Sequence, residues 1–226
     1  MAEQIEIRID VVSDVVCPWC YVGAERLRQA LAKLPDISAE VHWRPFQLDP
    51  TIPPEGLERK AYMRAKFGND DSRLKEMHDR LIESTRDAGI PFAFDKIEIA
   101  ANTIDAHRLI RWAAGQGQEI QDKVVRALFK ANFVEGRRIG DHAVLLEIAE
   151  ESGMDGSVVS ALLPTDADRD AVRAEIEQAQ RMGVTGVPCF LLENKYAVMG
   201  AQPTDALADA IRQVAQAKSD GTLHSA

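Results

Sequence analysis

The sequence predicts an α/β fold in which a β–α–β opening and a β–β–α ending flank a long helical segment. Three observations carry this prediction. Residues 5–12 and 37–43 show the alternation of strands, and residues 187–199 hold two short apolar runs around a turn. Between them, residues 55–182 place apolar side chains at helical spacing. The chain has 226 residues, 46% of them hydrophobic, which is enough to bury a core.

The first strand and the first helix meet at a pair of cysteines. Isoleucines alternate with charged residues over 5–10, and two valines follow, which predicts a strand. After Cys17-Pro18-Trp19-Cys20, apolar residues recur at helical spacing over 24–34, and Pro35 ends the helix. Proline suits the first turn of a helix, where its missing N–H has no partner to lose. We therefore expect the cysteine motif at a strand-to-helix junction.

The next strand completes a parallel unit. Residues 37–43 alternate again and end at Pro45, so the chain opens β–α–β with a crossover helix. The proline-containing loop 51–56 is the expected domain boundary. In the helical segment that follows, Asn102 and Asp141 are the expected helix caps.

The end of the chain returns to strand patterns. An apolar strand over 187–192, a turn at 193–195 and a strand over 196–199 predict a hairpin. Pro203 opens a final amphipathic helix. We expect two domains. The first is discontinuous and takes residues 1–50 plus 184–226, and the second is a helical insertion domain of residues 51–183.

Composition excludes several classes of function. The chain carries 27 Lys and Arg against 36 Asp and Glu, for a net charge of −9. This balance argues against nucleic-acid partners, since their affinity depends on clustered basic residues. No apolar run approaches the roughly 18 residues of a membrane span, so we expect no membrane partner. The first residues hold no basic region followed by an apolar stretch, so we expect no signal peptide and a cytoplasmic location.

The three cysteines indicate chemistry rather than a disulfide framework. They are few and odd in number, and two lie in one C-x-x-C motif. At a helix N-terminus, the free N–H groups and the helix dipole stabilise a thiolate, so we expect a lowered pKa and a nucleophilic role for Cys17. Cys20, one turn later, can attack a mixed disulfide on Cys17 and resolve it.

Two alternative interpretations of this motif remain open. One is half of a zinc site, and the other is a pair of unreactive cysteines in a helix. Zinc needs four ligands, and the five histidines show no H-x3-5-H pair that would complete such a site. We therefore predict a redox site without a metal.

Several segments together resemble the DsbA-like thiol oxidoreductases of the thioredoxin superfamily, in particular the FrnE-type branch. The similarity spans nearly the whole chain. The segments that carry it are Ser13–Gly23 with the Cys-Pro-Trp-Cys motif, Asn102-Thr103, Ala106–Leu109, Leu128-Phe129, Phe133, Glu135-Gly136, Gly183–Pro188 and Gly200–Gln202. The resemblance implies an α/β thioredoxin fold with a large all-α insertion between the second and third strands. It also implies that the enzyme is a DsbA-like protein-disulfide oxidoreductase.

The resemblance also implies site residues beyond the two cysteines. Pro188 matches the proline that is cis in thioredoxin folds and faces the cysteine pair; the alternative is a trans proline in an ordinary loop. With a cis bond, Val187 can offer its backbone to an extended substrate strand, and Val187 and Trp19 are the expected substrate-binding residues. Trp19 stands where the best-known DsbA motif has histidine, so we expect an intermediate reduction potential.

Two further residues have open roles. Asp10, on the first strand, is the candidate for the acid that many thioredoxin-fold enzymes bury beneath the resolving cysteine, where a raised pKa would let it accept a proton. Its alternative role is a solvent-facing strand residue. Cys189 follows Pro188 and is either an accessory thiol near the site or a buried apolar residue.

The expected function is thiol–disulfide exchange on protein or small-thiol substrates. No cofactor is required; glutathione can serve as co-substrate, and glutathione or the thioredoxin system is the expected electron partner. The alternative is a glutathione-dependent isomerase or transferase of the 2-hydroxychromene-2-carboxylate isomerase or kappa type. Its motif usually carries Ser at the first cysteine position, whereas this chain has Cys17. A third, non-enzymatic alternative is a chaperone-like binder of client proteins.

Overall fold

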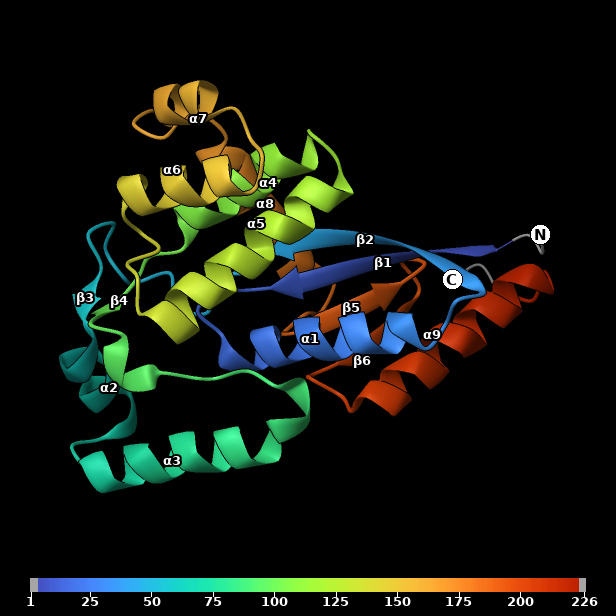
Figure 1. Cartoon of the computed structure of the whole chain (residues 1–226), viewed down its shortest axis with the longest axis horizontal. Helices are drawn as coiled ribbons and strands as arrows, with labels where there is room; N and C mark the ends of the chain where they lie inside the picture. Colours follow the sequence, from blue (N-terminus) through green and yellow to red (C-terminus); the bar gives the residue numbers. More distant parts are fainter. Residues whose placement is uncertain (1–3, 224–226) are drawn as a thin grey trace. The chain divides into compact units, whose positions relative to one another are not determined.

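A computed structural model describes residues 4–223 and divides the chain into two compact units (Figure 1). One unit takes the residues up to Phe46 and those from Ala174 onward, and the other takes Gln47–Arg173. The predicted boundaries, 50/51 and 183/184, differ from this division. In the structure, the second boundary falls inside helix α8 (Arg169–Arg181), because Ala179 on that helix already packs into the core of the first unit.

The first unit is built on a mixed four-stranded sheet in the order β2-β1-β5-β6. Its strands are β1 (Ile5–Ser13), β2 (Ile37–Pro45), β5 (Cys189–Leu192) and β6 (Tyr196–Met199). β1 runs parallel to β2 and antiparallel to β5, and β6 is antiparallel to β5. The hairpin turn between β5 and β6 takes residues 193–195 and has positive φ angles at Glu193 and Asn194, the left-handed conformation that Asn tolerates better than most residues.

Helices cover both faces of this sheet. α1 (Pro18–Ala32) and α9 (Thr204–Ser219) lie side by side on one face (Figure 1). Phe190 points toward this face, because the α1 backbone at Gly23 passes close to its ring. On the opposite face, Val12 and Cys189 pack against Ala179 of α8. The alternation of side chains along β1 and β5 thus supplies two apolar layers.

The second unit is mainly helical. Its elements are β3 (Leu57–Glu58), α2 (Arg59–Phe67), α3 (Asp71–Ser84), two short 3₁₀ turns (Arg86–Ala88 and Phe94–Lys96), β4 (Ile99–Ala100), α4 (Ile104–Ala114), α5 (Gln118–Lys130), α6 (His142–Glu151), α7 (Gly156–Leu162) and the first residues of α8. α5 continues into a π-helical turn, Ala131–Glu135. β3 and β4 form a two-stranded antiparallel sheet that the helical interpretation of residues 55–182 did not include.

One predicted helix cap, Asp141, is at its expected position, and the other, Asn102, lies one residue before the cap position. The Asp141 carboxylate accepts a hydrogen bond from the backbone N–H of Ala143 at the start of α6. The Asn102 carboxamide oxygen accepts from the N–H of Ile104, although Thr103 occupies the cap position of α4. Both side chains therefore satisfy N–H groups that a helix leaves unpaired.

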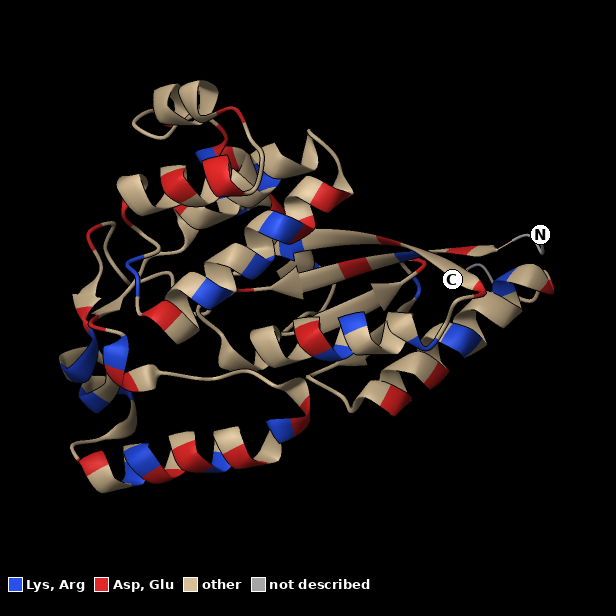
Figure 2. Cartoon of the chain, in the orientation of Figure 1, with Lys and Arg blue, Asp and Glu red and all other residues tan. Residues whose placement is uncertain are grey.

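The surface of α3 is highly charged. This helix buries only Leu81, and Figure 2 shows acidic and basic residues interspersed along it. Lys75 pairs with Asp79, and Arg80 pairs with Glu76, both at the i,i+4 spacing of neighbouring side chains on a helix. Among residues 4–223, no helix is long and apolar enough to cross a membrane.

A buried arginine organises the second unit. The side chain of Arg108, on α4, is fully buried and donates hydrogen bonds to Asp105 and to four backbone carbonyls. Those carbonyls belong to Leu162, Leu163, Thr165 and Ala167. The guanidinium group therefore satisfies the C-terminal carbonyls of α7 and the segment that leads into α8.

We predict that Arg108→Met lowers the free energy of unfolding by at least about 3 kcal/mol, because it leaves several buried carbonyls without a donor. Arg111→Met is the matched control, since Arg111 lies on the same helix in a half-exposed ion pair with Asp168. We expect the control to cost less than about 1 kcal/mol. Urea denaturation of both variants measures the difference, and equal losses would contradict the role of Arg108.

Candidate active site

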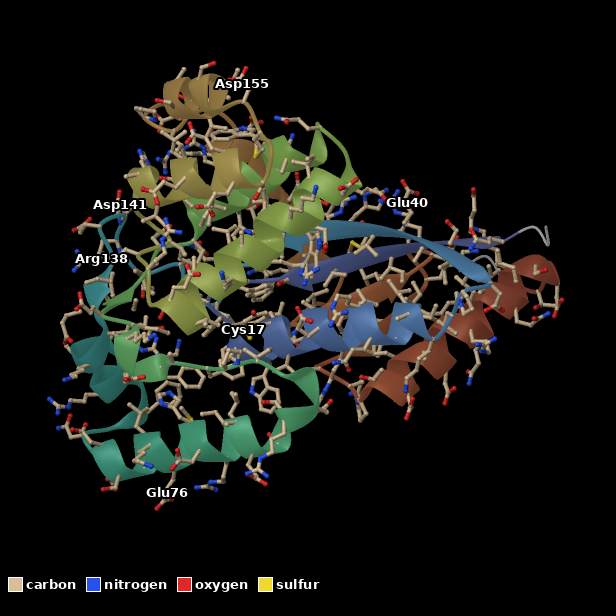
Figure 3. All side chains as sticks on the ribbon, in the orientation of Figure 1. Cys17, Glu40, Glu76, Arg138, Asp141 and Asp155 are labelled. Carbon is tan, nitrogen blue, oxygen red and sulfur yellow. The ribbon has the colours of Figure 1, made fainter. Side chains whose placement is uncertain are left out.

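Cys17 lies at the N-terminal end of α1 (Figure 3). It occupies the N-cap position with extended backbone angles, and Pro18 follows at the first position of the helix. The Cys17 N–H donates to the carbonyl of Asp14, while the Cys17 carbonyl accepts from the N–H of Cys20. The sulfur therefore lies where a helix presents unpaired N–H groups and the positive end of its dipole.

These surroundings stabilise the Cys17 thiolate. A hydrogen bond from the Cys20 thiol lowers the pKa of Cys17, and the backbone N–H groups of Cys20 and Trp19 lower it further. Burial and the negative charge of Asp14 oppose this shift without reversing it. The pKa of Cys17 thus lies below its ordinary value, which is the condition for a nucleophilic cysteine near neutral pH.

Cys20 has the opposite character. It is 1% exposed, and this burial raises the pKa of its thiol well above the ordinary value. The adjacent Cys17 sulfur raises that pKa further, because the Cys20 thiol must keep its proton to donate to Cys17. The motif therefore holds two thiols with opposite pKa shifts: the thiolate form is favoured at Cys17 and the thiol form at Cys20.

The loop before β5 lies against the first cysteine. The Val187–Pro188 peptide bond is cis, and the Cys17 sulfur lies 3.8 Å from the carbonyl oxygen of Val187. Pro188 is buried, and Val187 is half-buried. Trp19, between the two cysteines, is 41% exposed. The fold therefore brings Cys17, Cys20, Val187 and Pro188 together, with an exposed aromatic ring in the same motif.

The structure corrects the expectation for Asp10. Its side chain is buried, but it lines a surface depression with Ala179 of α8, on the sheet face opposite α1. Its carboxylate accepts hydrogen bonds from Arg8 at 2.7 Å and from Arg44 at 2.6 Å. Burial raises the pKa of Asp10, but the hydrogen bonds and charges of both arginines outweigh it and hold this pKa below its ordinary value. A carboxylate held in this way is a poor proton acceptor.

The acid beside the cysteine pair is Asp14, which the sequence interpretation did not single out. Asp14 is fully buried, three residues before Cys17, and its charge acts directly on the Cys17 sulfur. Its backbone also hydrogen-bonds to the Cys20 thiol. A signal for it exists in the sequence, because Asp14 is the one charged residue within the apolar run from Val11 to Val16.

Cys189 lies in the core. It is fully buried, pairs with Val12 across the sheet and packs with Ala179 and Val184. Burial raises the pKa of its thiol. These surroundings make it a small apolar packing residue rather than a reactive thiol. All three cysteines are free thiols in this structure.

Two further observations concern metal ligands and Arg108. Within residues 4–223, no three His, Cys, Asp or Glu side chains gather as metal ligands would. Arg108, which lies in the Ala106–Leu109 segment that carries the resemblance, donates its hydrogen bonds to backbone carbonyls of the second unit.

The sequence and fold of this chain are similar to those of known proteins. A family model described as a DSBA-like thioredoxin domain matches residues 8–212. The structure of a probable DsbA oxidoreductase from Streptomyces coelicolor is 32% identical, with a TM-score of 0.84, over 92% of this chain and 89% of that one.

Two more distant structures share the fold. A 2-hydroxychromene-2-carboxylate isomerase is 20% identical, with a TM-score of 0.69, over 96% of this chain and all of that one (100%). The cytosolic disulfide reductase DsbM from Pseudomonas aeruginosa, solved with GSH, is 21% identical, with a TM-score of 0.62, over 95% of this chain and 98% of that one.

We predict that Asp14→Asn shifts the ionisation of Cys17 to lower pH, because it removes a negative charge that disfavours the thiolate. The rate of Cys17 alkylation rises with pH as the thiolate forms, so the midpoint of this rise should fall in the variant. Asp10→Asn is the matched control and should leave the midpoint unchanged. A shift in the control, or an upward shift in Asp14→Asn, would contradict the assignment of Asp14.

Proposed function

We propose, on the premise that the chain belongs to the DSBA-like thioredoxin domain family, that it is a thiol–disulfide oxidoreductase acting through Cys17 and Cys20. One observation carries the proposal: the two sulfurs are hydrogen-bonded to each other and have opposite pKa shifts, lowered at Cys17 and raised at Cys20. Disulfide exchange needs this asymmetry, because one sulfur must attack first and the other must wait as a thiol.

The reaction proceeds in two displacements. The Cys17 thiolate attacks one sulfur of a substrate disulfide, forms a mixed disulfide and releases the other sulfur as a thiolate. Cys20 then loses its proton and attacks the Cys17 sulfur, which releases the second substrate sulfur as a thiolate. Two electrons pass to the substrate, and a Cys17–Cys20 disulfide remains. The reverse sequence oxidises a substrate dithiol.

Asp14 is the proposed proton acceptor for Cys20. Deprotonating a thiol whose pKa is raised by burial requires a nearby base, and Asp14 is the fully buried acid whose charge acts on the site.

Substrates are proposed to bind at Val187 and Trp19. The Val187 carbonyl lies beside the reacting sulfur, so a substrate strand that pairs with this backbone brings its disulfide to Cys17. The exposed Trp19 ring offers apolar contact area next to the same sulfur. We propose glutathione or the thioredoxin system as electron partner in the cytoplasm, with glutathione as the small-thiol co-substrate.

A second candidate function is a glutathione-dependent isomerase, favoured by the shared fold with 2-hydroxychromene-2-carboxylate isomerase. That chemistry leaves Cys20 without a role. It therefore predicts that Cys20→Ala retains full activity and that the protein binds glutathione without dithiol turnover.

The test is insulin reduction and trapping with single-cysteine substitutions. We expect Cys17→Ser to reduce the rate to the uncatalysed level, because no other described cysteine is placed as a nucleophile. Cys20→Ala should accumulate mixed disulfides with substrate, because the resolving thiol is missing. Cys189→Ala is the control and should keep the rate of the unmodified protein.

Retention of turnover by Cys17→Ser would overturn the proposed mechanism. Glutathione binding by the unmodified protein without any turnover of insulin would favour the isomerase alternative.

A further inference from the structure

One face of α1 connects the cysteine pair to the loop that carries Val187 and Pro188. Cys20, Gly23 and Arg26 follow each other at intervals of three residues, so they lie along the same side of the helix. All three are buried. This face is therefore the part of α1 that determines how close the loop can approach.

Gly23 allows the closest approach. A Cβ atom at this position would lie 2.9 Å from the Cγ of Pro188 and 3.1 Å from the Phe190 ring. Both distances are shorter than ordinary carbon–carbon contacts. Because a proline ring is rigid, any side chain at position 23 would have to push the loop away from the helix.

Arg26 binds the turn at Gly200–Ala201, which adjoins this loop. It is 7% exposed, and its Nη1 donates a 2.6 Å hydrogen bond to the carbonyl of Ala201. The preceding residue, Gly200, donates its N–H to the carbonyl of Pro188 at 2.8 Å. Gly200 has φ of 77°, a turn conformation that suits glycine and brings these two contacts together. Two hydrogen bonds, joined by the Gly200–Ala201 peptide bond, thus link Arg26 to Pro188.

We propose that Arg26 is a positioning residue that fixes the Val187–Pro188 backbone relative to Cys17, so that extended polypeptide substrates are bound in register with the reacting sulfur. The proposal rests on the proposed exchange function and deepens it. Arg26 is the anchor on the helix, and the Gly200–Ala201 turn transmits its position to Pro188. This role predicts substrate selectivity, because only a substrate with a peptide backbone can pair by hydrogen bonds with the backbone of Val187.

The experiment compares Arg26→Met with Arg28→Met on two disulfides. Arg28 lies on the same helix with a 54% exposed side chain that pairs with Glu25, so it is a matched control. The first substrate is an extended peptide with a mixed disulfide at its central cysteine, and the second is a small aromatic disulfide without a peptide backbone. KM and kcat are measured separately for each.

We expect Arg26→Met to raise KM for the peptide roughly tenfold, the effect of losing one charge-assisted contact, with kcat and the rate on the small disulfide unchanged. Arg26→Lys, which keeps a cationic donor, should recover part of the loss. Gly23→Ala should also raise KM for the peptide, because its methyl group would displace Pro188. This second variant keeps the proposal testable if Arg26→Met does not fold.

Hydrogen exchange at the Gly200 amide gives a readout independent of catalysis. It should be faster in Arg26→Met than in Arg28→Met, because the turn loses its anchor. Equal losses on both disulfides, or unchanged exchange at Gly200, would overturn the positioning role. If the unmodified protein reduces neither disulfide, the proposed exchange function fails, and the Gly200 exchange alone then decides the role of Arg26.

Discussion

The unequal hydrogen bonding of two buried sulfur atoms one helical turn apart is the constraint on which the rest of this site depends. Hydrogen bonds from the Cys20 thiol and from backbone N–H groups at the start of α1 lower the pKa of Cys17. Burial raises the pKa of Cys20, so this thiol keeps its proton. Strand β1 must end and the helix must begin within a few residues for this difference to arise. Pro18 makes the abrupt start possible, and the central position of β1 in the sheet fixes where it happens.

Much of the fold follows from local patterns. The alternation in β1 and β2, the helical spacing of α1, and the hairpin turn at Glu193 and Asn194 are all visible in the sequence, and the structure confirms the predicted α/β thioredoxin fold with its helical insertion. The pairing of β3 with β4 could not be predicted, because two-residue strands have no period. The boundary between the two units inside α8 could not be predicted either, since helical spacing does not show which unit each helical turn packs against.

The site was predictable where chemistry depends on neighbours in sequence and not where it depends on register. Cys17 and Cys20 follow from their spacing and from the strand before them. The surroundings of Asp10 follow from the parallel pairing of β1 with β2, which brings Arg44 next to it, and no local pattern specifies that register. Asp14 was missed because a single acid next to the motif does not show from the sequence whether its side chain is buried. Its burial depends on packing around the strand-to-helix junction.

The most direct test of the account is the equilibrium of the reduced protein with a graded series of glutathione redox buffers, followed by mass-spectrometric mapping of the disulfides. We predict a single two-electron transition in which Cys17 pairs with Cys20 and Cys189 stays free. Because Trp19 adds no charge beside the thiolate, the reduction potential should lie between about −270 and −180 mV. A potential near about −120 mV, or oxidation that yields only a glutathione adduct of Cys17, would contradict it.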